Sequence, residues 1–401
     1  MTDALSGLKA ALAKRSGTNA EDWYPVFKAR QGMFVAFDQM RRAREAAGLP
    51  QGRVVTQLFT CCTAVDPIVA AGLAPVYGDL SPRTLALDPE RMPLDDRTCG
   101  VVIQHTYGIQ DPVLDARSAL VARQAGALAL EDCAHCAGRL SRDEQGAPVA
   151  DLSFHSFGVE KMLPTHFGGA VWVNPAMADR ELRAAIVAAL SGLAEVAPRR
   201  ARAARAYRNQ IRVIGHLPAG MGKALRERLE GAGRFEPAIS AVELAGGLGS
   251  TAALPDAWVA EKARAALEGS DAADRQRERA VGVYRELFSG SAVAPGDEAW
   301  VAIGGTEPPQ PLLRFGFFRT DAEAADAAVQ RVRAAGFYAV PWYRPVLFPG
   351  VTDPATYGLA DGVEKALGSL PVTCAASRGA VALPTDLSPD QVRACAGAAR
   401  G

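Results

Sequence analysis

Short apolar segments alternate with helical patterns along the first two-fifths of this 401-residue chain, and this alternation limits the possible folds more than any other feature. Nearly continuous apolar runs, which predict strands, stand at 54–59, 74–80, 99–108 and 127–134. Helical patterns cover 33–48 and 111–126. Strands and helices in such alternation favour a parallel sheet covered on both faces, and ligands of such sheets bind at the carboxyl ends of the strands.

The pattern changes beyond residue 177. Two more strands are predicted at 151–157 and 168–174, separated by a short loop. The next stretch, 178–257, is rich in Arg and Ala and mostly helical up to 230, then rich in Gly and Ala without clear periodicity. We interpret it as a helical insertion or a cover over the sheet domain.

The last third of the chain predicts a smaller α+β unit. A long helical pattern covers 257–288, and a Ser N-cap precedes the final helix at 388–400. Between them we expect strands at 311–318, 337–343 and 378–384 and a helix at 321–336. We therefore predict a large domain over 1–257, which includes the insertion at about 178–257, and a small C-terminal domain over 258–401.

Composition narrows the function classes. Lys+Arg and Asp+Glu are both 44, so we expect neither nucleic acid nor an acidic membrane surface as a partner. No apolar run reaches 18 residues, and the amphipathic N-terminus does not resemble a signal peptide, so a cytoplasmic protein is expected. The seven cysteines predict reduced thiols, and the Cys133/Cys136 pair lacks the second pair of ligands that a metal site needs, so we predict none.

An acid, a hydroxyl and a lysine follow the strands of the predicted sheet. Asp132 ends one apolar run, Ser156 ends another, and Lys161 comes five residues later. Only seven lysines occur in the chain, and lysine, unlike arginine, can form a Schiff base with an aldehyde. Pyridoxal-phosphate enzymes need such a lysine, an acid for the ring nitrogen, and hydroxyl and backbone N–H groups for the phosphate.

The order and spacing of five segments resemble the DegT/StrS-type sugar aminotransferases, a branch of the fold-type I pyridoxal-phosphate enzymes. The segments are 56–92, 101–108, EDCAHCAG at 131–138, SFHSFGVEKMLPTHFGGAVWVN at 153–174, and 382–388. The resemblance is good from about Arg30 to Asn174 and absent between Met177 and Trp258. It implies a mostly parallel seven-stranded sheet with helices on both faces, and a smaller C-terminal α+β domain.

The resemblance also implies roles for individual residues. Lys161 matches the lysine that holds pyridoxal 5'-phosphate as an internal aldimine. Asp132 matches the acid that pairs with the ring nitrogen, and Ala134 would pack against the ring. His135 would lie near the phenolic oxygen, and Ser156 would bind the phosphate.

Two positions depart from the family pattern. Where the family has Ser-Gly-Thr, this chain has Arg30 followed by Gln31, Gly32 and Met33; we expect their backbone N–H groups to complete the phosphate site at the start of the helix over 33–48. Where an aromatic side chain usually stacks on the cofactor, this chain has Cys61, so stacking is expected from Phe59 or the thiol.

The implied function is transfer of an amino group from an amino acid, Glu or Gln, to a keto group of a sugar-like acceptor. This would serve sugar or secondary-metabolite biosynthesis, in a homodimer with shared active sites. Two alternatives stay open: another pyridoxal-phosphate reaction, such as a lyase or a transamination of a non-sugar intermediate, and a degenerate cofactor-binding regulatory homologue. The arginines of the insertion are either a solvated helix face or a grip for an anionic acceptor: Arg199, Arg200, Arg202 and Arg205.

Overall fold

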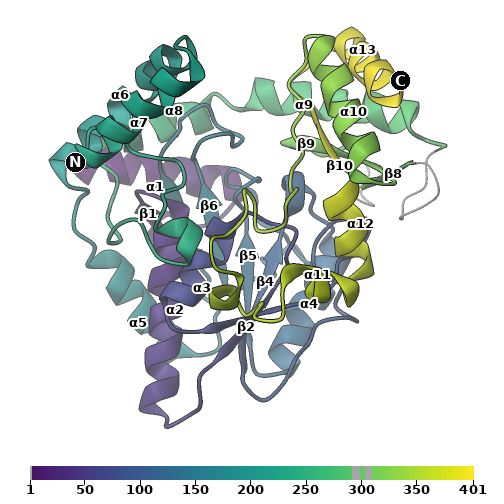
Figure 1. Ribbon diagram of the computed structural model, residues 1–401. Coiled ribbons are helices and arrows are strands. Elements are labelled where there is room, and N and C mark those ends of the chain that lie inside the picture. The colour runs from purple at the N-terminus through teal and green to yellow at the C-terminus, as the bar shows by residue number, and fades with distance from the viewer. Residues whose placement is uncertain (1, 291–298, 303–308) are drawn as a thin grey trace.

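A seven-stranded sheet forms the centre of the molecule in the computed structural model, which describes residues 2–290, 299–302 and 309–401 (Figure 1). The strand order is β1-β7-β6-β5-β4-β2-β3, and only β7 runs against the others. The mostly parallel sheet is thus confirmed; its edge strand β1 was not expected. The strands are β1 (Trp23–Val26), β2 (Arg53–Thr56), β3 (Ala74–Tyr77), β4 (Thr98–Gln104), β5 (Leu128–Asp132), β6 (Leu152–Ser156) and β7 (Gly169–Val173).

Helices cover both faces of this sheet, as predicted. On one face, α2 (Ala29–Ala46) and α5 (Arg180–Ser191) bury Phe37 and Ile186 against apolar strand residues such as Leu130. On the other face, α4 (Pro112–Gln124) packs through Ala119 and Ala122. The remaining helices of this domain are α1 (Thr2–Ser16), which packs over β1, and α3 (Asp66–Ala70). Among the described residues, no helix is both long and apolar enough to cross a membrane.

After α5, which covers the sheet, the insertion continues with a helical hairpin that projects from the sheet domain, at the upper left of Figure 1. It consists of α6 (Pro198–Gly215) and α7 (Ala219–Gly231). The chain then returns through 232–256 with only one short 3-10 turn, η4 (Glu243–Ala245), as the lack of periodicity predicted. Tyr207 and Phe235 bury their rings against Phe27 and Phe167 of the sheet domain. The insertion is therefore packed onto the sheet domain through an apolar cluster of its own.

A second, three-stranded sheet of order β10-β9-β8 lies in the C-terminal region, with α9, α10 and α13 packed on it. Its elements and their neighbours are α8 (Ala257–Glu268), α9 (Asp271–Leu287), β8 (Ala299–Ala302), β9 (Arg314–Arg319), α10 (Ala322–Ala334), α11 (Val363–Gly368), α12 (Pro371–Gly379), β10 (Ala380–Pro384) and α13 (Pro389–Arg400). Ser388 caps α13 in a full capping box, as expected. The predicted boundary between the two domains, at residues 257 and 258, falls at the start of α8 and stays a prediction. The helix α8 packs against α1 of the large domain. Residues 291–298 and 303–308 of the predicted small domain are not described.

Two expectations for this region are wrong. The pattern over 257–288 forms two helices, because the Ser270 hydroxyl donates to the Leu267 carbonyl oxygen (2.8 Å) at the end of α8 and the chain then turns to pack α9 against α13. The segment 337–343 is not a strand. Only Val340 pairs with β10, opposite Ala382, and the residues after it leave the sheet and enter the cavity described next.

Candidate active site

The carboxyl ends of β4, β5 and β6 open into a cavity of about 180 Å³, more than ten times the space that one water molecule needs. Residues from the start of α2, the loop after β2, the insertion and the C-terminal region complete its walls. Its position agrees with the expectation that a ligand site lies at the strand ends.

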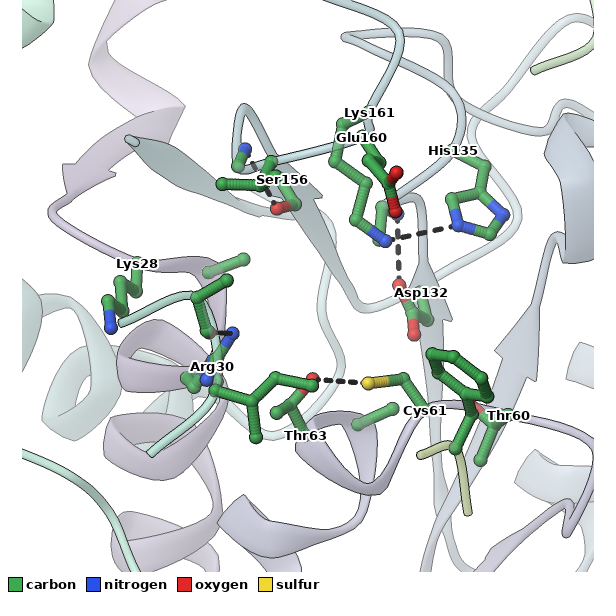
Figure 2. A pocket seen from close by; sticks show the side chains of 18 of the residues that line it. Lys28, Arg30, Thr60, Cys61, Thr63, Asp132, His135, Ser156, Glu160 and Lys161 are labelled. Atoms are coloured by element: carbon green, nitrogen blue, oxygen red, sulfur yellow. Dashed lines mark hydrogen bonds between the residues drawn. The ribbon is translucent and has the colours of Figure 1, made fainter. Parts of the chain in front are cut away.

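Lys161, Asp132 and His135 meet at one end of this cavity (Figure 2). The Lys161 Nζ lies 3.1 Å from the His135 Nε2. Burial lowers the pKa of Lys161 below its usual value, although Cys61 and Asp132 nearby favour the ammonium form. A buried amine with a lowered pKa is a better nucleophile at neutral pH, because more of it carries a free lone pair.

Asp132 ends β5, and its side chain is held by its own loop. One carboxylate oxygen, Oδ1, accepts a hydrogen bond from the Ala134 backbone N–H (2.9 Å). Burial raises the pKa of Asp132, because an apolar environment disfavours the charged form. A cation beside this carboxylate would offset that cost, so Asp132 is suited to a ligand that carries a positive charge.

The His135 ring is neutral and has a defined tautomer. Burial lowers its pKa well below the usual value, with a smaller contribution from Lys161. Its Nδ1 accepts a hydrogen bond from the Tyr107 backbone N–H (3.0 Å). The single ring proton is therefore on Nε2, which faces Lys161 and the Tyr343 hydroxyl (3.2 Å).

Ser156 and the start of α2 form the other end of the cavity (Figure 2). Gly169 is paired with Ser156 across β6 and β7, and a Cβ at this glycine would lie 2.8 Å from the Ala29 nitrogen and 2.7 Å from the His155 carbonyl oxygen. The missing side chain thus lets the first turn of α2 approach the end of β6. A hydroxyl beside a helix N-terminus is a suitable binding site for a phosphate.

Two cations, the buried Lys28 and the half-buried Arg30, connect this end of the cavity to the insertion. The Lys28 Nζ pairs with Glu236 (2.6 Å), which also accepts from Arg200 (2.6 Å). Arg30 pairs with Glu243 (2.6 Å). Between the two glutamates, the chain passes along the cavity and lines it at 238–239. The insertion is therefore a wall of the site.

Cys61 lines the cavity immediately before the short 3-10 turn η2 (Cys62–Ala64). The Thr63 hydroxyl donates to its Sγ (3.0 Å). The pKa of Cys61 is lowered to about 6, chiefly by a hydrogen bond from Cys62, while burial opposes the shift. The lowered pKa favours the thiolate form of this side chain, which lines the cavity.

Seven of the ten site residues predicted from the sequence line this cavity. They are Met33, Cys61, Asp132, Ala134, His135, Ser156 and Lys161. Gln31, Gly32 and Phe59 are not among the described residues that line it. The Gln31 amide donates to the Ser250 hydroxyl (2.8 Å), and a Cβ at Gly32 would lie 2.3 Å from the Val171 side chain.

The interpretation of 30–33 as a turn before the helix is wrong, because α2 already begins at Ala29. Residues 30–33 form its first turn, in which only Arg30 and Met33 reach the cavity. Phe59 is fully buried and meets Tyr107 and Tyr343 edge-on in the core.

Sequence reasoning missed four lining residues that matter chemically: Lys28, Glu160, Trp342 and Tyr343. It named Arg30 only for its backbone N–H group and did not anticipate the ion pair of its side chain with Glu243. The rarity of lysine could have drawn attention to Lys28 as it did to Lys161. The aromatic pair at 342–343 was assigned to a strand, so its approach to a site nearly two hundred residues away was not anticipated.

The arginines of the insertion are used within the insertion or exposed. Arg200 binds Glu236, Arg205 binds Asp256, and Arg199 donates to the Ala232 carbonyl oxygen. Arg202 is exposed. None of the four is among the described residues that line the cavity, so this geometry does not support their role in gripping an anionic acceptor.

Known proteins resemble part of this chain in sequence. Residues 40–206 match the model of the DegT/DnrJ/EryC1/StrS aminotransferase family. An L-glutamine:2-deoxy-scyllo-inosose aminotransferase from Streptomyces lividus is 33% identical over 133 residues, which cover 32% of this chain and 31% of that protein. A UDP-2-acetamido-2-deoxy-3-oxo-D-glucuronate aminotransferase from Pseudomonas aeruginosa is 30% identical over 153 residues, 37% of this chain and 41% of that protein. The matches span less than half the length of either relative.

The fold has solved counterparts over nearly the whole chain. The crystal structure of an aminotransferase, TlmJ, from Streptoalloteichus hindustanus aligns with a TM-score of 0.66 at 22% identity, over 99% of this chain and 90% of that one. The predicted fold class is thus confirmed. Over residues 40–206, this chain is similar to the DegT/DnrJ/EryC1/StrS aminotransferase family.

Proposed function

We propose that this protein is a pyridoxal-phosphate-dependent aminotransferase. The observation that carries the proposal is the arrangement of Lys161, Asp132 and Ser156 around one cavity, with an amine and a carboxylate at one end and a hydroxyl beside a helix N-terminus at the other. These are the groups that an aldehyde, a ring nitrogen and a phosphate require, in the order in which one small molecule would present them.

The residues present fit this cofactor. Lys161 would hold its aldehyde carbon, Asp132 its ring nitrogen, and Ser156 with the first turn of α2 its phosphate. The fit is supported by the close approach of Gly169 to Ala29 and by the burial of the Asp132 carboxylate, whose cost a cationic ring nitrogen would offset. When bound, pyridoxal phosphate supplies an aldehyde that condenses with amines and a ring that withdraws electrons from the attached carbon.

The chain's own groups then bind and move protons. The Lys161 Nζ would hold the cofactor covalently, and as a free amine it would be the base that takes a proton from the substrate carbon and returns it. Asp132 keeps a proton on the ring nitrogen by its negative charge. His135 donates its Nε2–H toward the ligand space, because its Nδ1 is already an acceptor for Tyr107.

The names of two relatives support a proposal for the substrates. One is named for an inosose and another for a 3-oxo-glucuronate, so we infer a cyclic, polyhydroxylated keto acceptor and glutamine or glutamate as the amino donor. We also infer a biosynthetic role in the cytoplasm and a homodimer that shares its active sites.

Cofactor attachment at Lys161 is the first test. Purified protein mixed with pyridoxal phosphate is expected to turn yellow, and borohydride is expected to fix the label on the peptide that contains Lys161. Lys161→Ala should lose the label, whereas the surface variant Lys262→Arg should keep it. Label on another lysine, or a protein that never binds the cofactor, would contradict the proposal and favour a regulatory homologue.

The loaded enzyme separates transamination from other pyridoxal-phosphate reactions. Glutamine or glutamate alone should convert the absorbance to that of the amine form of the cofactor, and the corresponding keto acid should appear in equal amount. A lyase would instead release products without leaving the cofactor aminated.

A further inference from the structure

Tyr343 reaches the cavity from the C-terminal region in a fixed position. The residues after it attach to the loop that follows β2: the Leu347 N–H donates to the Leu58 carbonyl oxygen (3.1 Å) and the Phe348 N–H to that of Thr60 (2.8 Å). The Tyr343 ring lies nearly parallel to that of Tyr107, with centroids 6.4 Å apart and an interplanar angle of 11°. Its hydroxyl lies 3.2 Å from the His135 Nε2.

The buried Nε2–H of His135 needs an acceptor at all times, because an unpaired buried donor is costly. It has two neighbours, the Lys161 Nζ at 3.1 Å and the Tyr343 hydroxyl at 3.2 Å. A neutral lysine can accept this hydrogen bond through its lone pair. An ammonium cannot, since all its groups are donors, and the tyrosine oxygen is then the acceptor that remains.

We propose that Tyr343 is a positioning residue for Lys161. Its hydroxyl accepts the hydrogen bond from the His135 Nε2–H whenever Lys161 is an ammonium, and this allows Lys161 to exist in both protonation states. The inference rests on the proposed function, in which Lys161 alternately takes and releases a proton. Tyr343 acts through His135, and burial keeps it a neutral phenol by raising its pKa well above the usual value.

Other charged groups also lie near Lys161 and affect its pKa. Cys61 from the loop after β2, Asp132 from β5 and Glu160 from the loop after β6 favour the ammonium, while Arg30 from α2 and burial disfavour it. None of these groups accepts the His135 proton in the described structure, so their effect is independent of the Tyr343 hydroxyl.

Tyr343→Phe tests the proposal in the cofactor-free protein. Removing the hydroxyl leaves neutral Lys161 as the acceptor for His135, so the ammonium form is penalised. The pH dependence of Lys161 acetylation, followed by mass spectrometry of its peptide, should move down by about one unit, which is a tenfold change in the neutral fraction at a given pH below the transition. A titration that does not move would overturn the proposal.

Tyr107→Phe is the matched control. Tyr107 lies beside Tyr343 and is also buried, but its hydroxyl donates to the Trp342 carbonyl oxygen and does not reach His135. It should leave the titration of Lys161 unchanged. An equal shift in both variants would show a general loss of packing and also overturn the proposal.

A double variant separates this mechanism from a direct effect of Tyr343 on the lysine. In a His135→Leu background no Nε2–H exists, so adding Tyr343→Phe should no longer shift the Lys161 titration. A shift that persists there would refute the role of His135. All these measurements use protein without pyridoxal phosphate, so they succeed or fail separately from cofactor attachment at Lys161.

Discussion

The charge of Asp132 is needed for the proposed reaction, but its burial lowers the stability of the protein without cofactor. Its carboxylate lies in an apolar environment that raises its pKa, and the Ala134 N–H supplies one hydrogen bond. A carboxylate in such a place destabilises the empty protein and becomes favourable when a cation binds beside it. We therefore expect its charge to matter for the reaction and its shape for the fold.

Asp132→Asn separates these two contributions. The amide oxygen keeps the hydrogen bond from Ala134, so the melting temperature without cofactor should stay the same or rise. The amide cannot hold a proton on the ring nitrogen, so the rate of the half-reaction with glutamine should fall at least about a hundredfold. Stopped-flow absorbance gives the rate, and near-normal turnover would count against the assignment.

Among single residues, those that could be predicted from the sequence are reactive or charged side chains at or just after the ends of predicted strands. Asp132 and Ser156 end apolar strands and Lys161 follows Ser156 by five residues, and the geometry of a parallel sheet brings strand ends together. Tyr343 could not be found in this way, because its place depends on backbone contacts with a loop nearly three hundred residues earlier. No local pattern encodes such a contact.

The insertion is the element that most distinguishes this site. Glu236 is buried and pairs with both Lys28 and Arg200, so one side chain connects α2, α6 and the segment after α7. Breaking a buried ion pair by removing one partner leaves the other charge uncompensated, which is far costlier than losing an exposed pair.

Glu236→Gln should therefore loosen this wall. We expect the free energy of unfolding in urea to fall by about 3 kcal/mol and trypsin to cleave faster at Arg234. Glu230→Gln removes a partly exposed pair with Arg226 within α7 and should change the free energy by less than about 0.5 kcal/mol. Equal effects of the two variants would contradict a special role of Glu236.

Six of the seven strands of the large sheet, all but the edge strand β1, were predictable because their apolar runs reflect burial on both faces. The break at Ser270 and the single bridge at Val340 were not, because both depend on packing partners elsewhere: α1 and α13 for the helices, and the cavity for the segment over 337–343. Tertiary contacts override local preference in both places.

At the scale of the whole molecule, we expect two copies to associate. Two-fold homodimers are the commonest oligomers, and the family resemblance implies sites shared between subunits. Large apolar side chains are exposed on α4, at Val113 and Leu120, and on α6 and α7, at Val213 and Met221. Sedimentation velocity should give the mass of a dimer at assay concentration. A monomer with full specific activity on dilution would refute the prediction.

The cavity is assembled from stretches that are far apart in the chain. Lys161 and Asp132 lie in the first half of the sequence and are synthesised early. The cavity wall at 342–348 is synthesised much later, after β9, and only then can it bind to the loop after β2. During synthesis, therefore, a ribosome-bound chain carries its reactive lysine long before it has a closed pocket. A ligand that needs every wall stabilises only the finished molecule, so its binding energy selects completed chains over truncated ones.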